Sequence, residues 1–194
     1  ADDGGGLSGY AALSFVVNAP PTSGVVALAP RYGVVLETHF GYACSGWVDD
    51  ASDLPLLYSF YYLARGTAIE YQLVADTPSD SFDGALLPQG AGNASEVDAV
   101  AYVADQLAAA TRAVDTVVVC PFGRAVPTNN GGVACRPAQV VVTNLANQTG
   151  ALLASAFETG DVAAVFQAMV SSSSVLNAVN CSRPCDRFHR ATCE

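Results

Sequence analysis

The sequence lacks lysine and is short of charge, and these two absences exclude several classes of partner. Its eight basic residues are all arginine, against 18 acidic residues, so the formal net charge is −10. Only 13% of the residues are charged, about half of the usual ~25%. Nucleic-acid binding requires a basic surface, and anionic membranes repel an acidic chain. We therefore expect no nucleic acid and no membrane surface among the partners.

Long apolar runs and catalytic motifs are also missing. No apolar run reaches the roughly 20 residues that a membrane-spanning helix needs, so we expect no membrane insertion. The chain contains neither G-x-S-x-G nor H-E-x-x-H, and its two histidines are His39 and His189. We expect a protein that is not an enzyme and has no cofactor. A catalytic site assembled only in space is kept as a third hypothesis.

The chain does contain two marks of the secretory route, an even set of cysteines and several N-x-S/T sequons. The cysteines are Cys44, Cys120, Cys135, Cys181, Cys185 and Cys193, and the sequons begin at Asn93, Asn147 and Asn180. Disulfides persist outside the cytosol, where asparagines of sequons can also carry glycans. The combination predicts an extracellular or cell-surface glycoprotein with disulfides.

The pairing of the cysteines is only partly predicted by their spacing. Cys120 and Cys135 bracket a loop rich in Pro, Gly and Asn, which predicts a local disulfide between them. Cys44 then pairs within the C-terminal tail, or a cysteine of the tail pairs with a neighbouring module. The sequence leaves this choice open.

The tail repeats its metal-binding residue types at intervals of four. Cys181, Cys185, His189 and Cys193 could face one side of a helix and hold zinc. Disulfides are the favoured interpretation, because the secretory context supports them and Pro184 interrupts a regular helix.

Alternation of apolar and polar residues predicts that the fold is mainly β. Leu36, Phe40, Tyr42 and Cys44 share one strand face, with His39 on the other. Short strands separated by turns are typical of an immunoglobulin- or fibronectin-III-like β-sandwich. We expect strands near residues 10–17, 24–29, 36–44, 57–63, 69–73, 86–88, 97–104 and 116–120, with 106–113 as a helical turn or a long loop.

The period of the apolar residues becomes helical in the last third of the chain. Val142, Leu145, Leu152 and Ala156 share one face, and a second stripe is formed by Val162, Val165, Phe166, Met169 and Leu176. This pattern predicts a helical hairpin that docks on the sandwich. We divide the chain into a flexible lead-in (1–9), the β-sandwich (10–120), a disulfide-closed linker (121–137), the helical hairpin (138–179) and a Cys-rich tail (180–194).

Two further clusters each have a structural and a functional interpretation. Asp49, Asp50 and Asp53 could bind Ca²⁺, although a turn in which aspartates cap backbone amides is favoured over a metal site. The aromatic residues Trp47, Tyr58, Phe60, Tyr61 and Tyr62 could stack on carbohydrate. Burial in the core of the sandwich is the favoured interpretation of these aromatics, above all of Trp47.

One stretch carries a resemblance to a known family. The pattern N-A-P-P-x-x-G … P-x-x-G-x-x-L-x-T-x-F … C-x-G-W-x-D … D-L-P-L-x-Y-x-F runs from Asn18 to Phe60. It resembles the REJ (receptor for egg jelly) region of polycystin-1-like proteins, and the resemblance continues to about Asn177. The matching residues are Asn18, Pro20, Pro21, Gly24, Pro30, Gly33, Leu36, Thr38, Phe40, Gly46, Trp47, Asp49, Asp53, Leu54, Pro55, Leu56, Tyr58 and Phe60.

The resemblance implies a module of a large cell-surface ectodomain, associated with adhesion and with polycystin channels, and it transfers no catalytic residue. The Ala-rich, Lys-free composition is similar to that of green-algal flagellar-surface or mastigoneme-like relatives. We therefore expect a structural or adhesive module of a cell-surface or filamentous assembly, whose partners are neighbouring modules or copies of the same protein. The alternative is a ligand-binding ectodomain, for carbohydrate or Ca²⁺, of a polycystin-type receptor or channel complex.

Overall fold

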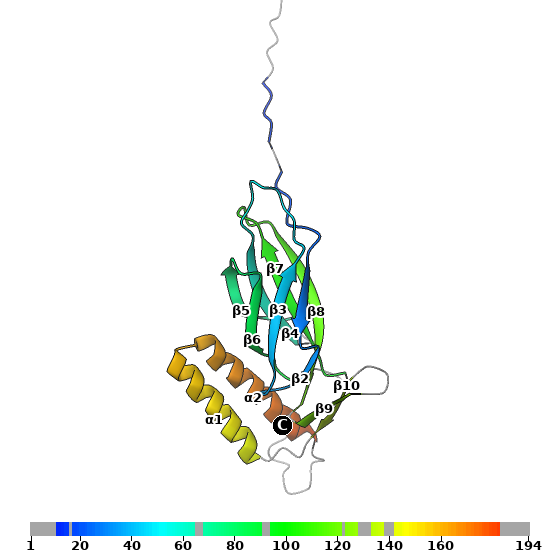
Figure 1. Ribbon diagram of the computed structural model, residues 1–194, viewed down its shortest axis with the longest axis vertical. Coiled ribbons are helices and arrows are strands. Elements are labelled where there is room, and N and C mark those ends of the chain that lie inside the picture. The colour runs from blue at the N-terminus through cyan, green and yellow to red at the C-terminus, as the bar shows by residue number, and fades with distance from the viewer. Residues whose placement is uncertain are drawn as a thin grey trace, which may run out of the picture.

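Two β-sheets packed face to face form the body of the molecule (Figure 1). The computed structural model describes residues 11–15, 17–64, 68–90, 94–121, 123–127, 133–137 and 142–182. One sheet has the order β1-β3-β6, formed by β1 (Val25–Ala29), β3 (His39–Ser45) and β6 (Ser81–Leu86). The other has the order β2-β8-β7-β4-β5, formed by β2 (Tyr32–Val34), β8 (Ala110–Cys120), β7 (Glu96–Ala104), β4 (Leu57–Ala64) and β5 (Glu70–Thr77).

Alternating apolar residues fill the space between the two sheets. In β3 the side chains of Phe40, Tyr42 and Cys44 are buried, while His39 on the other face is exposed. The rings of Tyr42, Phe60 and Phe82 lie 5.4 to 6.3 Å apart, between centroids, and join the two layers. The prediction of a mainly β sandwich followed by two helices is confirmed.

Several of the predicted elements are wrong in their extent. The strand expected at 36–44 begins only at His39, and the strand expected at 86–88 is instead the end of β6, which stops at Leu86. Residues 11–15 and 17 form no strand, and Leu13, Phe15 and Val17 are exposed, because this segment has no neighbouring strand to pair with. The loop predicted at 106–113 is also too long, since β8 begins at Ala110 and pairs with β7 from Ala110 to Val118. The first half of β8 does not alternate apolar with polar residues, because Thr111 and Asp115 lie on its half-buried face and Val114 lies on its exposed face.

A short hairpin lies in the predicted linker. Strands β9 (Gly123–Pro127) and β10 (Val133–Pro137) pair in antiparallel fashion. A disulfide joins Cys120, the last residue of β8, to Cys135 in β10. This covalent bond ties the hairpin to the end of the sandwich.

The chain ends in a helical hairpin at one pole of the sandwich (Figure 1). It comprises α1 (Val142–Thr159) and α2 (Val162–Ser182), so α2 continues past the predicted boundary at residue 179. Gly160, with φ of +69°, makes the reversal, and Asp161 caps α2 by accepting the Ala164 N–H. The predicted lead-in at 1–9 and residues 183–194 of the predicted tail lie outside the described residues.

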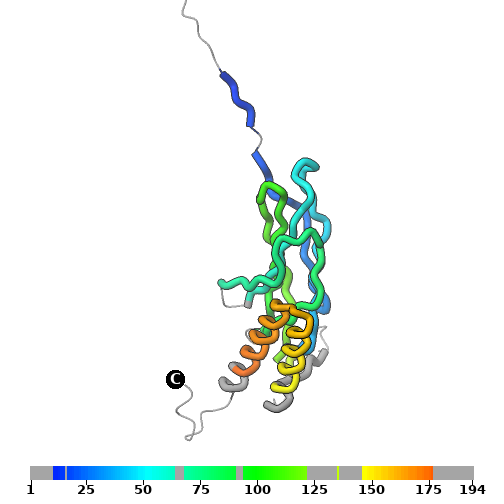
Figure 2. Tube along the Cα trace, turned by 90° about the vertical axis from the view of Figure 1, so that its left-hand side faces the viewer, coloured from blue at the N-terminus to red at the C-terminus, as the bar shows by residue number. Residues whose placement is uncertain are grey.

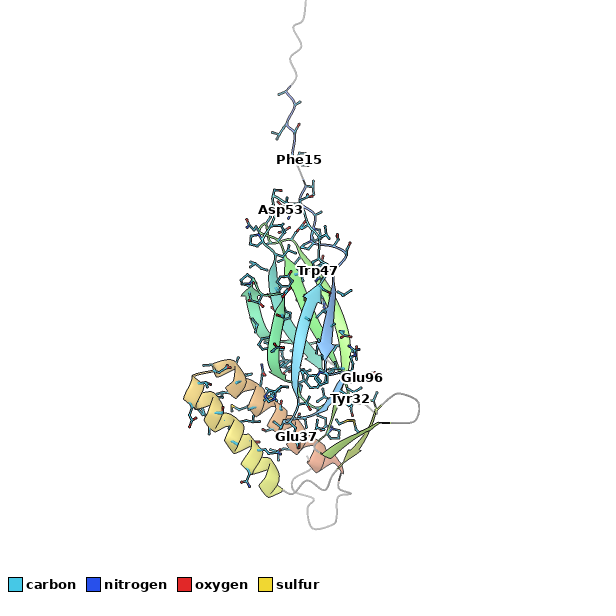
Figure 3. All side chains as sticks on the ribbon, in the orientation of Figure 1. Phe15, Tyr32, Glu37, Trp47, Asp53 and Glu96 are labelled. Carbon is cyan, nitrogen blue, oxygen red and sulfur yellow. A yellow bond between two sulfur atoms is a disulfide. The ribbon has the colours of Figure 1, made fainter. Side chains whose placement is uncertain are left out.

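The two poles of the sandwich therefore differ. The helices occupy one pole, and the described N-terminal residues leave from the opposite one (Figures 1 and 3). None of the described helices combines the length and the apolar character that crossing a bilayer requires.

Candidate functional site

The apolar stripe of α2 faces away from the sandwich. Val162, Phe166, Met169 and Leu176 are 77%, 66%, 58% and 49% exposed. The face that docks carries small and polar side chains instead, with Gln167, Ala168, Ser171 and Val175 buried. The expectation of a docked hairpin is met, but the stripe that predicted α2 is not its docking face.

Hydrogen bonds to the edge strand β6 explain why α2 is rotated so that its apolar stripe faces away from the sandwich. The backbone N–H of Leu86, in β6, donates to Gln167 Oε1 at 2.9 Å, and the Ser171 hydroxyl donates to the Leu86 carbonyl at 3.4 Å. Gln89 N–H donates to the Ser174 hydroxyl at 3.3 Å. Buried backbone groups at a sheet edge require polar partners, and α2 supplies them from one face, so its apolar stripe is left on the opposite side.

The exposed stripe borders an apolar groove of about 350 Å³ between α2 and the β4–β5 hairpin. In Figure 2 this hairpin projects from the sandwich just above the helices. The groove is lined by Tyr62, Tyr71, Gln72, Leu73, Val162, Ala163, Phe166, Gln167 and Val170. The lining contains no Asp, Glu, Arg or His, which distinguishes the groove from the rest of an acidic surface.

Two tyrosines form the wall of the groove that belongs to the hairpin. The rings of Tyr62 and Tyr71 are stacked, with centroids 5.0 Å apart and an interplanar angle of 13°. Burial, and to a smaller extent Tyr71, raises the pKa of Tyr62 to about 12. The Tyr62 phenol therefore stays neutral throughout the physiological range. Tyr62 itself is buried, so the aromatic surface of this wall is mainly that of Tyr71, which is 37% exposed.

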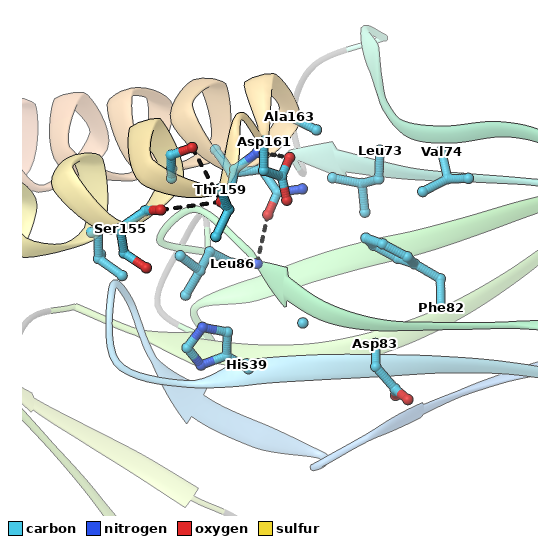
Figure 4. A pocket seen from close by; sticks show the side chains of 15 residues that line it. His39, Leu73, Val74, Phe82, Asp83, Leu86, Ser155, Thr159, Asp161 and Ala163 are labelled. Atoms are coloured by element: carbon cyan, nitrogen blue, oxygen red, sulfur yellow. Dashed lines mark hydrogen bonds between the residues drawn. The ribbon is translucent and has the colours of Figure 1, made fainter.

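A second cavity, of about 480 Å³, lies on the other side of α2 (Figure 4). Its lining includes His39, Asp83, Ser155, Thr159 and Asp161, the residue types of a hydrolytic site. However, the Thr159 hydroxyl donates to the carbonyls of Ser155 and Ala156, and Asp161 caps α2. Within the described part of the chain no hydrogen bond joins His39 to a nucleophile or an acid, so this geometry assembles no catalytic pair. The absence of enzymatic activity stays a prediction.

The acidic loop predicted as a cap or a weak calcium site lies at the pole opposite the helices (Figure 3). Asp49 Oδ1 accepts the Asp50 N–H, and the Asp53 N–H donates to the Asp50 carbonyl, as expected of a turn. The carboxylates of Asp49, Asp53 and Asp105 lie close together and form a cluster. Asp50 is exposed and does not belong to this cluster. Sequence reasoning missed Asp105, although its place directly after the strand at 97–104 was a usable signal.

The aromatic residues considered as a carbohydrate platform belong mainly to the interior. Phe60 and Tyr62 are buried, and Trp47 and Tyr58 pack against the core. A Cβ on Gly24 would lie about 2.0 Å from the Trp47 ring, so the indole covers this glycine closely. These positions support the interpretation of Trp47 as a core residue.

Cys44 is a buried thiol that has no disulfide partner among the described residues. Burial raises its pKa to about 11, which keeps the thiol protonated and unreactive. The side chains of Cys181, Cys185 and Cys193, the partners proposed for it, lie outside the described residues, as does His189 of the zinc alternative. The tail pairing therefore stays a prediction.

One of the three sequons is placed by the structure. Asn147 is exposed on α1, and the Thr149 hydroxyl lies 2.8 Å from that of Ser172 on α2. Asn93 and the side chain of Asn180 lie outside the described residues. Glycosylation at all three sites stays a prediction.

A comparison with known families identifies the family of the chain. The family model described as the REJ domain matches residues 1–171, most of the chain. A search of curated proteins finds no match. The matched range includes both sheets, all of α1 and the first half of α2.

Proposed function

The chain belongs to the REJ domain family, and from this premise we propose that it is a structural module that assembles through the exposed face of α2. As a REJ domain it is a polycystin-type extracellular module. The structural and adhesive role, and participation in a filament, go beyond membership of the family. The single observation that supports assembly is the exposed apolar stripe of α2, while adhesion and participation in a filament stay predictions.

The spacing of the stripe favours a helix as its partner. Val162, Phe166, Met169, Ser173 and Leu176 follow one another at intervals of four, three, four and three residues. This is the spacing by which two helices pack side by side in a coiled-coil-like contact. A helix with the same spacing is present in every copy of the chain, so we assign a second copy as the occupant.

Charge favours the same partner. The 21 residues of α2 include no ionisable group other than Cys181, and the lining of the adjoining groove contains no Asp, Glu, Arg or His. Two copies of a chain with a net charge of −10 repel each other at most orientations. Contact through α2 brings together the part of the surface where this repulsion is smallest.

Symmetry fixes the geometry of the contact. A two-fold interface brings the same patch of both copies together. If two α2 helices pair in antiparallel fashion about such an axis, Met169 lies against its own copy, and Val162 lies against Leu176 of the second copy. Met169 is the midpoint between Val162 and Leu176 in the sequence, so these three positions match one another in this register.

The expected affinity is weak. Burying the remaining exposed area of Val162, Phe166, Met169 and Leu176 in both copies contributes roughly 8–10 kcal/mol. Association costs at least about 4 kcal/mol in lost rigid-body freedom. With this smallest cost the difference corresponds to a dissociation constant of about 0.05–1 mM, which is the tightest binding expected and suits modules held together many times in an assembly.

Sedimentation velocity of the purified chain from about 10 µM to 1 mM tests the proposal. We expect concentration-dependent dimer formation that Phe166→Ser abolishes. Leu107→Ser is the matched control, because it removes an equally exposed apolar side chain from the β7–β8 turn at the opposite pole. A monomer at all concentrations, or equal association of the Phe166→Ser variant, would contradict the proposal.

A further inference from the structure

Three carboxylates converge at the pole of the sandwich opposite the helices. Asp49 and Asp53 belong to the loop before β4, and Asp105 follows the last residue of β7. Each offers an oxygen, and these oxygens all lie within 4.8 Å of one another. Asp105 is only 2% exposed, so part of this negative charge is removed from water.

No arginine neutralises this cluster in the part of the chain that the structure describes. The ion pairs there join Arg31 to Asp115 and Arg112 to Glu70. Burial raises the pKa of Asp105, but hydrogen bonds from Asn18 and from the amides of residues 107–109 outweigh it and hold the pKa below its usual range. The same hydrogen bonds hold the Asp105 carboxyl group in place beside those of Asp49 and Asp53.

Asn18 and Asp49 are half-buried, and each has one fully buried oxygen that finds no hydrogen-bond donor among the described residues. These two oxygens point to a bound cation. Asp49 Oδ1 accepts the Asp50 N–H at 2.9 Å, but Asp49 Oδ2 is buried without a partner. Asn18 donates through Nδ2 to Asp105 Oδ2 at 2.6 Å, while its own Oδ1 is likewise buried without a partner. Burying an unpaired oxygen is unfavourable, most of all when it is charged. A cation at this position would satisfy these oxygens and offset the repulsion between the carboxylates.

The chemistry of the ligands selects the cation. Carboxylate and amide oxygens are the ligands of Ca²⁺, whereas zinc in proteins prefers nitrogen and sulfur. With bonds of about 2.4 Å, two oxygens on opposite sides of a Ca²⁺ ion lie about 4.8 Å apart, so the cluster can close on this ion with little movement. Ca²⁺ also tolerates an irregular ligand set drawn from several loops, while Mg²⁺ requires near-ideal octahedral geometry.

We propose that Asn18, Asp49, Asp53 and Asp105 form a Ca²⁺ site that fastens the entering chain to the pole of the sandwich. Asn18 comes from the segment that leads into the fold, 87 residues from Asp105 in the sequence. The segment is already held nearby, since Thr22 and Val48 exchange backbone hydrogen bonds of 2.9 and 3.0 Å. The ion adds a bond between three separate segments, so its binding makes the entry of the chain more rigid. This proposal does not depend on contacts of α2.

Calorimetric titration of the full chain with CaCl2, together with thermal unfolding with and without Ca²⁺, tests the site. We expect one ion per chain, a dissociation constant of about 0.1–1 mM, as is usual for extracellular modules, and a higher Tm in Ca²⁺. MgCl2 at the same concentration serves as the comparison, and we expect a smaller rise in Tm from it.

Asp49→Asn and Asp50→Asn form a matched pair, because both remove one charge from the same loop and only Asp49 belongs to the cluster. We expect Asp49→Asn to weaken Ca²⁺ binding at least about tenfold, and Asp50→Asn to change it less than about twofold. In EDTA the order of stability should reverse, with Asp49→Asn unfolding at a higher Tm than the unchanged chain, because it relieves the repulsion that the ion would otherwise offset.

Two results would overturn the proposal. One is the absence of saturable Ca²⁺ binding up to about 10 mM in the unchanged chain, ten times the weakest affinity expected for such a module. The other is equal Ca²⁺ affinity in the Asp49→Asn and Asp50→Asn variants. Failure of dimer formation would leave this site unaffected, so the two proposals fail separately.

Discussion

The backbone N–H of Leu86 donates a buried 2.9 Å hydrogen bond to Gln167 Oε1, and this contact sets the rotation of α2 on the sandwich. Ser171, one turn further along α2, binds the carbonyl of the same residue. Both backbone groups of Leu86 are thus satisfied from one helix face. Satisfying this edge position turns the apolar stripe toward solvent, where a second copy can reach it.

Gln167→Leu tests the role of this hydrogen bond. The substitution keeps the size of the side chain but leaves the buried Leu86 N–H without an acceptor, which typically costs about 1–3 kcal/mol. We expect the free energy of unfolding in urea to fall by that amount, and hydrogen exchange in α2 to become faster than in β7. Ser173→Ala, on the exposed face of the same helix, is the control and should change stability by less than about 0.5 kcal/mol. Equal stability of the two variants would show that the hydrogen bond does not hold the helix.

Removal of the Cys120–Cys135 disulfide should destabilise the joint between the sandwich and the helices. The two cysteines are 15 residues apart, and closing a loop of this length stabilises a fold by about 3 kcal/mol. We expect the double variant Cys120→Ala/Cys135→Ala to unfold at a lower urea concentration, with the protection of β9 and β10 from hydrogen exchange lost first. An unchanged unfolding midpoint would mean that the β9–β10 hairpin is held without the covalent bond.

The ionised carboxyl group of Asp115 is expected to make the free energy of unfolding depend on pH in the acid range. Its Oδ2 accepts the Leu28 N–H at 2.9 Å and pairs with Arg31, so it joins β1 of one sheet to β8 of the other. Burial raises the pKa of Asp115, but the hydrogen bonds from Arg31, Leu28 and Thr116 outweigh burial and hold the pKa below its ordinary value.

The sign of the effect follows from this depressed pKa. A carboxyl group whose pKa is lower in the folded state contributes stability above its unfolded pKa of about 3.9, and loses it as the pH falls through the folded pKa. We expect Asp115→Asn to be less stable than the unchanged chain at pH 7, with a difference that is constant above about pH 5 and shrinks below about pH 4. Urea unfolding at several pH values measures it, and a difference that stays constant down to pH 2 would exclude this assignment.

The strands of the core could be predicted from the sequence, because the alternation of apolar and polar residues within a strand is a local signal. Phe40, Tyr42 and Cys44 alternate with polar or small residues, and this alternation predicts β3 and its buried face without knowledge of any partner strand. The same reasoning failed for Leu13 and Phe15, which alternate equally well but have no strand beside them. Whether a segment forms a strand depends on a neighbouring strand with which it can pair, and the sequence of the segment alone does not show whether that neighbour exists.

The two candidate sites depend on contacts between distant residues, which limited their prediction. The apolar stripe of α2 was visible in the sequence, but its direction depends on Leu86, 81 residues before Gln167. Asp49 and Asp53 were recognised as a weak calcium candidate, yet the buried Asp105 that joins them and the half-buried Asn18 that donates to Asp105 come from other segments. Residues so far apart in the sequence come together only when the sheets and their turns are assembled.

The most direct test of the assembly through α2 is a photo-cross-linking measurement at position 169. The photoreactive amino acid benzoylphenylalanine replaces Met169, and isotopically light and heavy copies are mixed, so that mass spectrometry distinguishes contacts between chains from contacts within one chain. Antiparallel pairing predicts mixed-isotope cross-links from position 169 to the central turns of α2 in the second copy, and their loss when Phe166→Ser is added. Cross-links confined to one chain, or directed to the sandwich of the second copy, would contradict pairing through α2.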